Sequence, residues 1–424
     1  MSHKHDLDIE HLARVEGHGN IKVRVENGEV KEASWDVVET PRFFEVMFKN
    51  KHYTSVGLLA ARICGICSIS HCLCSLRAIE HIFGVSIPES AVKLRLLAKH
   101  AETLQSHLLH VLFLALPDFL GEPSVIPLVE KNPEVVDIAR RLKHLANHLS
   151  DAVAGRTTHP VSFQVGGVTA VPKKEELIKF REELIRSFDD LDAVKELIKG
   201  FTIPDFVRET EFVTLKGVNK YPFIGGKLIS SDGVEHEEQE YKTMTNEYVD
   251  INNTSKWSKL SRESYAVGAL ARLNNNYQFL NSDGKKVADE LGLKPVCHNP
   301  FMNNVAQFIE CYHITREAIN LIEQIVDDPL KETFVPVTPK AGSGVGAIEA
   351  PRGILFHYYE FDKTGHIVKA DCVVPTTQNN GNIHYDMKNL VRQFTAEDIT
   401  DDKLGFICEM LVRSYDPCIS CSVH

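Results

Sequence analysis

The chain has 424 residues, of which 43% are hydrophobic and 25% are charged, so it can bury one large core or two to three smaller ones. The 47 basic and 58 acidic residues leave a net charge of −11 without a basic block, which argues against a nucleic-acid partner. No apolar stretch is long enough to span a bilayer, and the first residues lack the apolar segment of a signal peptide. Ten cysteines in such a chain indicate a reducing compartment, so we expect a cytoplasmic protein that uses cysteines as ligands.

Alternating apolar and polar residues predict a β-hairpin near the N-terminus. Residues 21–25 and 30–38 read as its strands, and Asn27-Gly28 reads as its turn. Glu16 lies just before this hairpin, and by residue type alone it is a solvated loop carboxylate. Glu45 lies inside the apolar stretch 41–48, where a carboxylate either reaches out to solvent or binds something, and composition leaves both open.

Helical periodicity predicts a set of long helices that form one body. The first predicted helix, residues 91–116, becomes apolar on nearly every face, which is typical of a core helix. Leu116-Pro117-Asp118 should end it. The histidines on these helices lack a nearby carboxylate-plus-histidine set and are expected to be structural. The predicted helices are 91–116, 134–154, 173–199, 259–280, 302–326 and 402–415.

Between the helices, three stretches indicate extended chain. Residues 201–256 are rich in predicted strands and turns, so they are the best candidate for a β-rich insertion. The glycine-rich stretch 342–353 lacks the ending of a P-loop, which leaves a segment of close backbone approach that presents Arg352. Residues 354–361 should form a strand and residues 371–380 an extended segment. We therefore expect an α+β fold that is mainly α, in a single domain over residues 1–424, with a core helix bundle, an N-terminal β-hairpin and peripheral β lobes.

Two cysteine pairs of the form C-x-x-C lie near opposite ends of the chain. Cys64 and Cys67 precede His71, and Cys418 and Cys421 precede His424. Two such pairs can converge to place four thiolates around one metal, and soft sulfur ligands select zinc, copper(I), iron–sulfur clusters or nickel. A structural zinc site remains an alternative. However, the pairs belong to a large chain that needs no staple, and an arginine and several carboxylates lie in segments that look buried.

These residues resemble the large subunit of nickel–iron hydrogenases over essentially the whole length of the chain. The matching motifs occur in the family's order, at residues 14–18, 41–45, 62–67, 349–353, 374–377 and 416–424. By this resemblance, Cys64 and Cys418 are terminal nickel ligands. Cys67 and Cys421 bridge nickel to an iron that carries two cyanides and one carbon monoxide.

The resemblance also implies roles for the residues around the metals. Arg352 lies over the open metal position with Asp118 and Asp416 holding it, and Asp118 is the looser match because Pro117 shifts the local pattern. Thr376 and the backbone near Pro351, Val374 and Pro375 hydrogen-bond the cyanides.

Further groups complete the implied site. His71 orients a bridging thiolate. Cys418 accepts the proton from dihydrogen, and Glu16 passes it outward. Glu45, the carbonyl of Cys372 and His424 hold a second metal, Mg²⁺ or Fe²⁺.

The resemblance extends to partners and substrate. It implies reversible cleavage of H₂ into protons and electrons, with an iron–sulfur small subunit that receives the electrons. Residues 377–379 and 416–421 look like those of the cytoplasmic group 3 enzymes, similar to the F420-non-reducing hydrogenases associated with heterodisulfide reductase. Further flavin or iron–sulfur subunits would then pass electrons to heterodisulfide reductase, ferredoxin or NAD(P). The alternative is a non-catalytic, metal-stapled scaffold subunit related to respiratory complex I.

Overall fold

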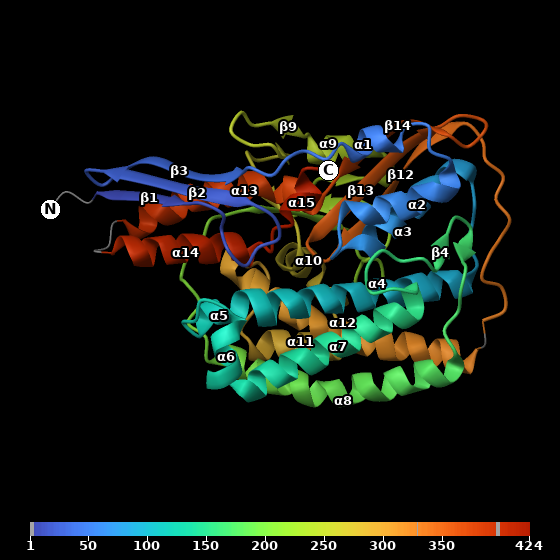
Figure 1. Cartoon of the computed structure of the whole chain (residues 1–424), viewed down its shortest axis with the longest axis horizontal. Helices are drawn as coiled ribbons and strands as arrows, with labels where there is room; N and C mark the ends of the chain where they lie inside the picture. The colour runs from blue at the N-terminus through green and yellow to red at the C-terminus, as the bar shows by residue number, and fades with distance from the viewer. Residues whose placement is uncertain (1–3, 329, 396–398) are drawn as a thin grey trace.

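A computed structural model describes residues 4–328, 330–395 and 399–424. Long helices fill one half of the molecule, and β-sheets with further helices fill the other (Figure 1). A core cluster of buried side chains runs from Leu12 to Val423 and therefore joins both halves. The predicted α+β class, mainly α, is confirmed.

Four long helices make up the helical layer. They are α4 (Glu89–Leu109), α7 (Pro133–Ala154), α8 (Lys174–Lys199) and α12 (Asn303–Asp327). Helices α4 and α12 are buried on most faces, whereas α7 and α8 bury one stripe each, at i, i+3 and i+4 spacing. The central pair α4 and α12 therefore forms the face of the helical layer on which the other half of the molecule packs.

The N-terminal hairpin is confirmed and belongs to a larger sheet. Strands β2 (Gly19–Glu26) and β3 (Glu29–Val37) are joined at Asn27-Gly28, and β1 (His5–Ile9) adds an antiparallel edge that was not predicted. Both turn residues have positive φ, as a tight hairpin turn of this sequence requires. The sheet packs on α13 (Pro375–Phe394) and α14 (Asp401–Ser414).

A second sheet, β12 (Gly342–Ala350), β13 (Gly353–Phe361) and β14 (Ile367–Val373), is an antiparallel meander packed on α3 (Ser68–Phe83). The predicted close approach at its glycines is confirmed. A Cβ on Gly346 would lie 2.2 Å from the carbonyl oxygen of Cys74 on α3. Glycine here lets the sheet touch the helix backbone, which fixes α3 relative to the β12–β13 turn.

The stretch 201–256 is rich in short strands, as predicted. Strands β6 (Glu211–Leu215), β7 (Leu228–Ser230) and β8 (Glu235–His236) join β11 (Tyr265–Ala266) in one sheet, while β9 (Tyr248–Val249) pairs with β10 (Lys256–Trp257). Strand β6 contacts both β12 and β13. Whether this stretch is an insertion within a single domain over residues 1–424 stays a prediction.

The predicted helix 259–280 is wrong over its first half. Helix α10 covers only Ala269–Asn276, and the residues before it are irregular or belong to β11. The carboxylate of Glu211 accepts the backbone N–H groups of Ser261 and Arg262, at 3.0 and 3.2 Å, which diverts these donors from helical bonds. Gly268, with a φ of 118°, then precedes the helix.

One predicted boundary is confirmed and another is wrong. The helical run of α4 continues through a π-helical turn (His110–Ala115) into α5 (Leu116–Phe119) and ends there, one residue after the predicted end at Leu116-Pro117-Asp118. The expected extended segment 371–380 is extended only to Val373, since Pro375 begins α13. Pro375 lies where a helix does not need its missing N–H.

The remaining elements are short and connect these layers. The helical ones are α1 (Phe44–Phe48), α2 (Tyr53–Ala60), η1 (Ala61–Ile63), α6 (Val125–Lys131), η3 (Glu238–Glu240), α9 (Tyr241–Thr245), η4 (Tyr277–Phe279), α11 (Ser282–Glu290), η5 (Pro300–Met302) and α15 (Ile419–Ser422). Strands β4 (Phe163–Gln164) and β5 (Gly167–Val168) form a small hairpin. Among the described residues, no helix is long and apolar enough to cross a membrane.

Candidate metal centre

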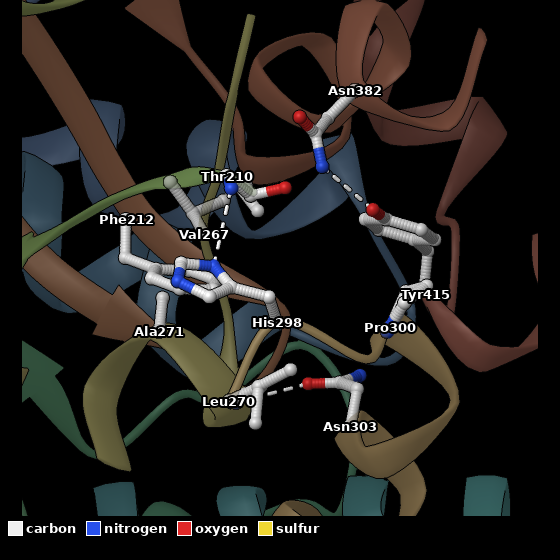
Figure 2. A pocket seen from close by; sticks show the side chains of 11 residues that line it. Thr210, Phe212, Val267, Leu270, Ala271, His298, Pro300, Asn303, Asn382 and Tyr415 are labelled. Atoms are coloured by element: carbon white, nitrogen blue, oxygen red, sulfur yellow. Dashed lines mark hydrogen bonds between the residues drawn. The ribbon is translucent and has the colours of Figure 1, made fainter. Parts of the chain in front are cut away.

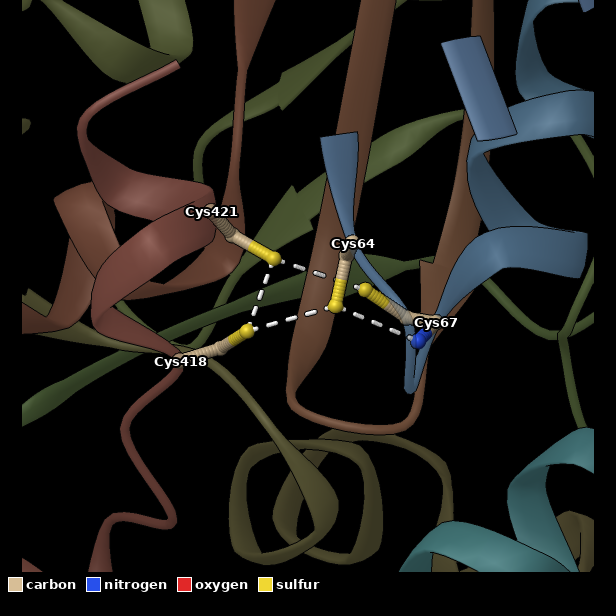
Figure 3. A group of neighbouring side chains, drawn as sticks. All are labelled: Cys64, Cys67, Cys418 and Cys421. Atoms are coloured by element: carbon tan, nitrogen blue, oxygen red, sulfur yellow. Dashed lines mark hydrogen bonds between the residues drawn. The ribbon is translucent and has the colours of Figure 1, made fainter. Parts of the chain in front are cut away.

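Four cysteine sulfurs gather at the contact between the two ends of the fold. The Sγ atoms of Cys64, Cys67, Cys418 and Cys421 all lie within 4.8 Å of one another, and each residue is at most 4% exposed. Figure 3 shows the two pairs facing each other, with Cys64 3.4 Å from Cys418 and Cys67 3.7 Å from Cys421. No other group of three or more histidine, cysteine or acidic ligands is found in the described part of the chain.

Local structure explains how each pair is presented. Cys64 ends the short helix η1, and Cys67 precedes α3, so the N–H groups of Ile66 and Cys67 point at the Sγ of Cys64, at 3.3 and 3.4 Å. Backbone N–H groups beside a helix start favour a thiolate. On the other side, Asp416 adopts a φ of 50° after α14, which turns the chain toward Cys418 and α15.

The pKa values of the four buried thiols favour a bound cation. Hydrogen bonds from the other three thiols lower the pKa of Cys64, whereas burial raises the pKa of Cys421. Four buried sulfurs therefore cannot all ionise by themselves, and a bound metal would deprotonate them. The four thiolates form a soft donor set suited to zinc, copper(I), iron or nickel.

Arg42 connects the two cysteine loops, a role that sequence reasoning did not assign. Its Nη2 donates to the carbonyl oxygen of Ile63, at 2.6 Å, and to that of Ser420. These residues directly precede Cys64 and Cys421. Its backbone N–H also bonds Val423, at 2.7 Å. The available signal was its place in the motif 41–45, but its partners lie far away in the sequence.

Arg352 lies at the turn between β12 and β13 and is 4% exposed. Its guanidinium interacts electrostatically with the sulfurs of the cluster. Its Nε donates to the carbonyl oxygen of Asp416, at 2.6 Å, and its Nη2 donates to the Asp416 carboxylate, at 2.7 Å. Its Nη1 is buried without a hydrogen-bond partner. The structure thus brings Arg352 and Asp416 together, as predicted, and leaves one charged donor unused.

Asp118 does not contact Arg352 in the way predicted. Its carboxylate accepts from Arg14, at 2.5 Å, and from the Nε and Nη2 of Arg413, at 2.7 and 2.9 Å. Both oxygens of the Asp118 carboxylate are therefore bonded to these two arginines. Asp118 therefore ties the loop before Glu16 to the helix before Asp416.

Asp416 receives a support that the sequence did not reveal. The Nε2 of Gln307 on α12 donates to its second carboxylate oxygen, at 3.1 Å. His110 holds the oxygen of Gln307, at 2.5 Å. Both supporting residues come from the helical layer, where their spacing looked only structural.

Residues 374–376 cap the start of α13 beside the sulfurs. The hydroxyl oxygen of Thr376 accepts the N–H of Cys418, at 2.9 Å, so its own proton remains free for another acceptor. Val374 is the residue before the helix, and Pro375 begins it. Pro351 lies next to Arg352 across the β12–β13 turn. These predicted residues therefore lie in the β12–β13 turn and at the start of α13.

Glu16 lies against the second cysteine loop. Its carboxylate accepts the N–H of Ser420, at 2.9 Å, and its carbonyl accepts the N–H of Ile419, at 2.9 Å. A Cβ on Gly17, which has a φ of 88°, would lie 2.6 Å from Ile419, so the backbone must pass very close here. The partly buried Glu16 carboxylate thus lies between the cysteine loop and the surface.

Glu45, Cys372 and His424 come together at the end of the chain, as predicted. The Nε2 of His424 lies 2.8 Å from the carbonyl oxygen of Cys372 and 3.8 Å from Oε1 of Glu45, and that oxygen accepts the N–H of Cys372, at 3.0 Å. Burial alone would raise the pKa of Glu45, but the bond to His424 and the charge of Lys256 lower it to about 2. The arrangement is an anionic oxygen, a carbonyl and an imidazole around one point.

His71 is fully buried on α3, and its Nδ1 lies 2.9 Å from the Nε2 of His357. Its Nε2 has no hydrogen-bond partner. Burial lowers the pKa of His71 to about 4, so the ring is neutral. A neutral imidazole with one unused nitrogen is suited to a hydrogen bond with a group in the centre.

A small pocket lies beside the chain leading to Asp416. Its wall includes Val267, Leu270, His298 and Tyr415 (Figure 2), and its inner volume is about 20 Å³. A space of that size holds about one water molecule. The pocket contains none of the predicted site residues, so it does not compete with the sulfur cluster as the functional site.

Comparison with protein families decides which metal chemistry this site serves. The model of nickel-dependent hydrogenases matches residues 42–137 and 230–424, which contain all four cysteines, and a HoxL-like model matches residues 6–40. The chain belongs to the nickel-dependent hydrogenase family. It is therefore an oxidoreductase of a family that acts on H₂.

Relatives cover nearly the whole chain. The alpha subunit of sulfhydrogenase 2 from Pyrococcus furiosus is 31% identical and aligns with 99% of this chain and 98% of its own length. One subunit of the vhu F420-non-reducing hydrogenase from Methanocaldococcus jannaschii is 33% identical, over 88% of this chain and 95% of its own. A crystal structure of an NAD⁺-reducing [NiFe]-hydrogenase in the H₂-reduced state has a TM-score of 0.89, with 25% identity over 99% of both chains.

The residues present fit a nickel-containing hydrogenase centre. The donor set is four buried sulfurs, which suits nickel and iron. The unused Nη1 of Arg352 and Nε2 of His71 and the free hydroxyl proton of Thr376 leave polar groups available to non-protein ligands. A closed structural zinc site would have no use for such groups.

Proposed function

We propose that this chain is the catalytic large subunit of a nickel–iron hydrogenase that reversibly cleaves H₂ into two protons and two electrons. The observation that carries the proposal is the convergence of four buried sulfurs beside the unpaired Nη1 of Arg352. In this assignment Cys64 and Cys418 would hold nickel, and Cys67 and Cys421 would be shared between nickel and an iron with two cyanides and one carbon monoxide. The centre supplies the electrophilic metal that polarises H₂.

The surrounding residues would hold the diatomic ligands and move the proton. Arg352 presents Nη1 while Asp416 holds the rest of its guanidinium. Pro351, in the β12–β13 turn, and Val374, Pro375 and Thr376, at the start of α13, would hold the cyanides. The thiolate of Cys418 accepts the proton, and Glu16 carries it outward from the neighbouring loop, which a half-buried carboxylate can do.

Three assignments concern supporting residues. Glu45, the carbonyl of Cys372 and His424 would bind Mg²⁺ or Fe²⁺, since they offer oxygen and nitrogen donors at one point. His71 would bond a bridging thiolate through its unused Nε2. Asp118 would act on the site only through Arg14 and Arg413.

Electrons need a path out of this protein. Besides the four gathered sulfurs, six cysteines are scattered over the chain, and they do not form a second cluster in the described residues. We therefore infer that the partner is an iron–sulfur small subunit, with further flavin or iron–sulfur subunits behind it. The relatives include F420-non-reducing and NAD-reducing hydrogenases, which favours soluble acceptors of the group 3 kind, namely heterodisulfide reductase, ferredoxin or NAD(P), in the cytoplasm.

Metal analysis with infrared spectroscopy of anaerobically purified protein tests the proposal. We expect equimolar nickel and additional iron, together with cyanide and carbonyl stretching bands. Cys67→Ser should remove the bands and both metals. Cys408→Ser, at a buried free thiol on α14 outside the cluster, should keep them. Zinc alone would favour the metal-stapled scaffold alternative, and no metal would leave the four sulfurs without the proposed centre; either result rejects the proposal.

A further inference from the structure

Arg272 on α10 is fully buried and touches the backbone that leads into Arg352. Its Nη1 donates to the carbonyl oxygen of Ala350, at 3.1 Å, and its Nη2 donates to that of Pro351, at 2.9 Å. We propose that Arg272 is a positioning residue that fixes the β12–β13 turn and thereby sets where the guanidinium of Arg352 lies. The effect on turnover rests on the proposed function, whereas the effect on the turn does not.

All three guanidinium nitrogens of Arg272 donate hydrogen bonds. Its Nε and Nη2 donate to the two carboxylate oxygens of Glu310, both at 2.7 Å, and its Nη1 also donates to Glu349, at 3.1 Å. The planar fork of arginine thus binds two carboxylates and two carbonyls at once. A lysine ammonium keeps the charge but cannot reach all four groups in this plane.

The two carboxylates are themselves held in place. Glu310 on α12 lies 2.6 Å from the Nε2 of His107 and accepts the hydroxyl of Tyr221, at 2.7 Å. Glu349 on β12 accepts the N–H of Leu215, at 2.7 Å. Arg272 therefore connects the turn to the rigid helical layer through fixed partners.

The turn is held at three places. The guanidinium of Arg352 is anchored to Asp416, and Ala350 pairs with Gly353 where β12 meets β13. Arg272 adds the side-chain donors to the carbonyls of Ala350 and Pro351, the two residues directly before Arg352. If the carbonyls of Ala350 and Pro351 lose their donor, the backbone shifts and Nη1 of Arg352 moves with it. A displacement of about 1 Å in a catalytic group can cost about 100-fold in rate.

Arg272→Lys tests the proposal, and Arg95→Lys is a matched control. Arg95 is also buried, binds both carboxylate oxygens of Glu80, at 2.9 and 2.7 Å, and donates to two backbone carbonyls, of Gln164 at 2.8 Å and Gly167 at 3.1 Å. Those carbonyls belong to the β4–β5 hairpin and not to the Arg352 turn. The control therefore removes the same kinds of contact from another place.

The first measurement is hydrogen–deuterium exchange of the purified protein. Arg272→Lys should speed amide exchange in residues 350–354 by about 10-fold, whereas Arg95→Lys should speed exchange only around residues 164–168. The second measurement is turnover per bound nickel, which should fall by about 100-fold for Arg272→Lys and less than 3-fold for Arg95→Lys.

A double variant separates positioning from general loss of structure. If Arg272 acts through Arg352, adding Arg272→Lys to Arg352→Lys should lower turnover no further, because the positioned group is already lost. Additive losses, or unchanged exchange in residues 350–354, would overturn the inference. Changed exchange in that turn, in a protein that cleaves no H₂ even without substitutions, would instead reject the proposed function and keep the structural claim.

Discussion

At the scale of single residues, Glu16 allows the sharpest test of proton transfer. Its carboxylate accepts the N–H of Ser420, and the carbonyl oxygen of a glutamine can accept the same bond. Glu16→Gln should therefore keep the loop and both metals but lose the ability to take up a proton. We expect a 10²- to 10⁴-fold loss of H₂/D₂ exchange, the usual value of a positioned acid–base group. Isotope exchange by mass spectrometry measures this.

Glu39→Gln is the matched control, since Glu39 also accepts a loop N–H, that of His18 at 3.0 Å, but its carboxylate bonds His18 and not a residue of a cysteine loop. It should leave the exchange rate unchanged. Normal exchange in Glu16→Gln would assign proton transfer to another group.

Arg352 provides a second prediction at this scale. A lysine carries its three donors on one nitrogen, so it cannot bond both the carbonyl and the carboxylate of Asp416 and still place a donor where Nη1 lies. Arg352→Lys should therefore assemble the centre yet lose most turnover. A lost charge-assisted hydrogen bond of about 1.5–3 kcal/mol corresponds to a rate loss of about 10- to 100-fold. Nickel content and H₂ oxidation should be measured together, and full turnover would refute the role of Arg352.

Sequence reasoning located the residues that carry chemistry more readily than the residues that hold them. The cysteines and Arg352 stand out because their types and spacing are unusual. The supports Arg42, Arg272 and Gln307 act through partners that are distant in sequence, and no local pattern records such a pairing. The same reason applies to Asp118, whose carboxylate bonds Arg14 and Arg413, while its role toward Arg352 stays a prediction.

At the scale of elements, Gly346 decides how α3 packs on β12. An added Cβ would lie 2.2 Å from the Cys74 carbonyl oxygen and 2.9 Å from the Ala78 nitrogen, both of which belong to the α3 backbone. Gly346→Ala should therefore push the helix away, lower the stability by about 3 kcal/mol and reduce nickel content, because α3 follows Cys67. Thermal unfolding and metal analysis test this.

Gly405→Ala on α14 is the comparison. Its Cβ would meet side chains only at 3.6 Å or more, and the site is helical, so we expect a gain of about 0.5–1 kcal/mol or no change. Equal melting temperatures for Gly346→Ala and the unsubstituted protein would show that the sheet can move away freely.

Elements with strong periodicity were predictable, and elements that depend on tertiary bonds were not. The helices at 134–154 and 173–199 and the N-terminal hairpin agree with their patterns. The helix at 259–280 failed because a distant carboxylate, that of Glu211, captures two backbone donors. Periodicity shows which face is apolar, but it does not show which side chain will compete for the backbone.

At the scale of the whole molecule, buried histidines should make the fold sensitive to acid. Burial lowers the pKa of His384 to about 4 and also lowers that of His100 and His357. Unfolded histidine titrates near 6.5, so below this pH the unfolded chain binds protons that the folded chain does not. Stability should therefore be full above pH 6.5 and fall progressively toward pH 4.

His384→Gln isolates one contribution to this acid sensitivity. After allowance for its partial exposure, the substitution should remove about 1 kcal/mol of the stability lost between pH 7 and pH 5. Thermal unfolding at both pH values measures the difference. His144→Gln, on the exposed face of α7, should leave the pH dependence unchanged. A pH dependence that is unaltered by His384→Gln would place the sensitivity elsewhere.

The distance along the chain between the two cysteine pairs has a consequence for biosynthesis. Partners across the cluster are separated by 354 residues, which a ribosome needs roughly 20–70 seconds to join at about 5–20 residues per second. During that interval the first two thiols have no second pair to share a metal with. Nickel insertion must therefore follow translation of Cys421, and a truncated nascent chain that lacks the second pair cannot be charged with the metal. The long separation thus delays completion of the four-sulfur site until both cysteine pairs have been translated.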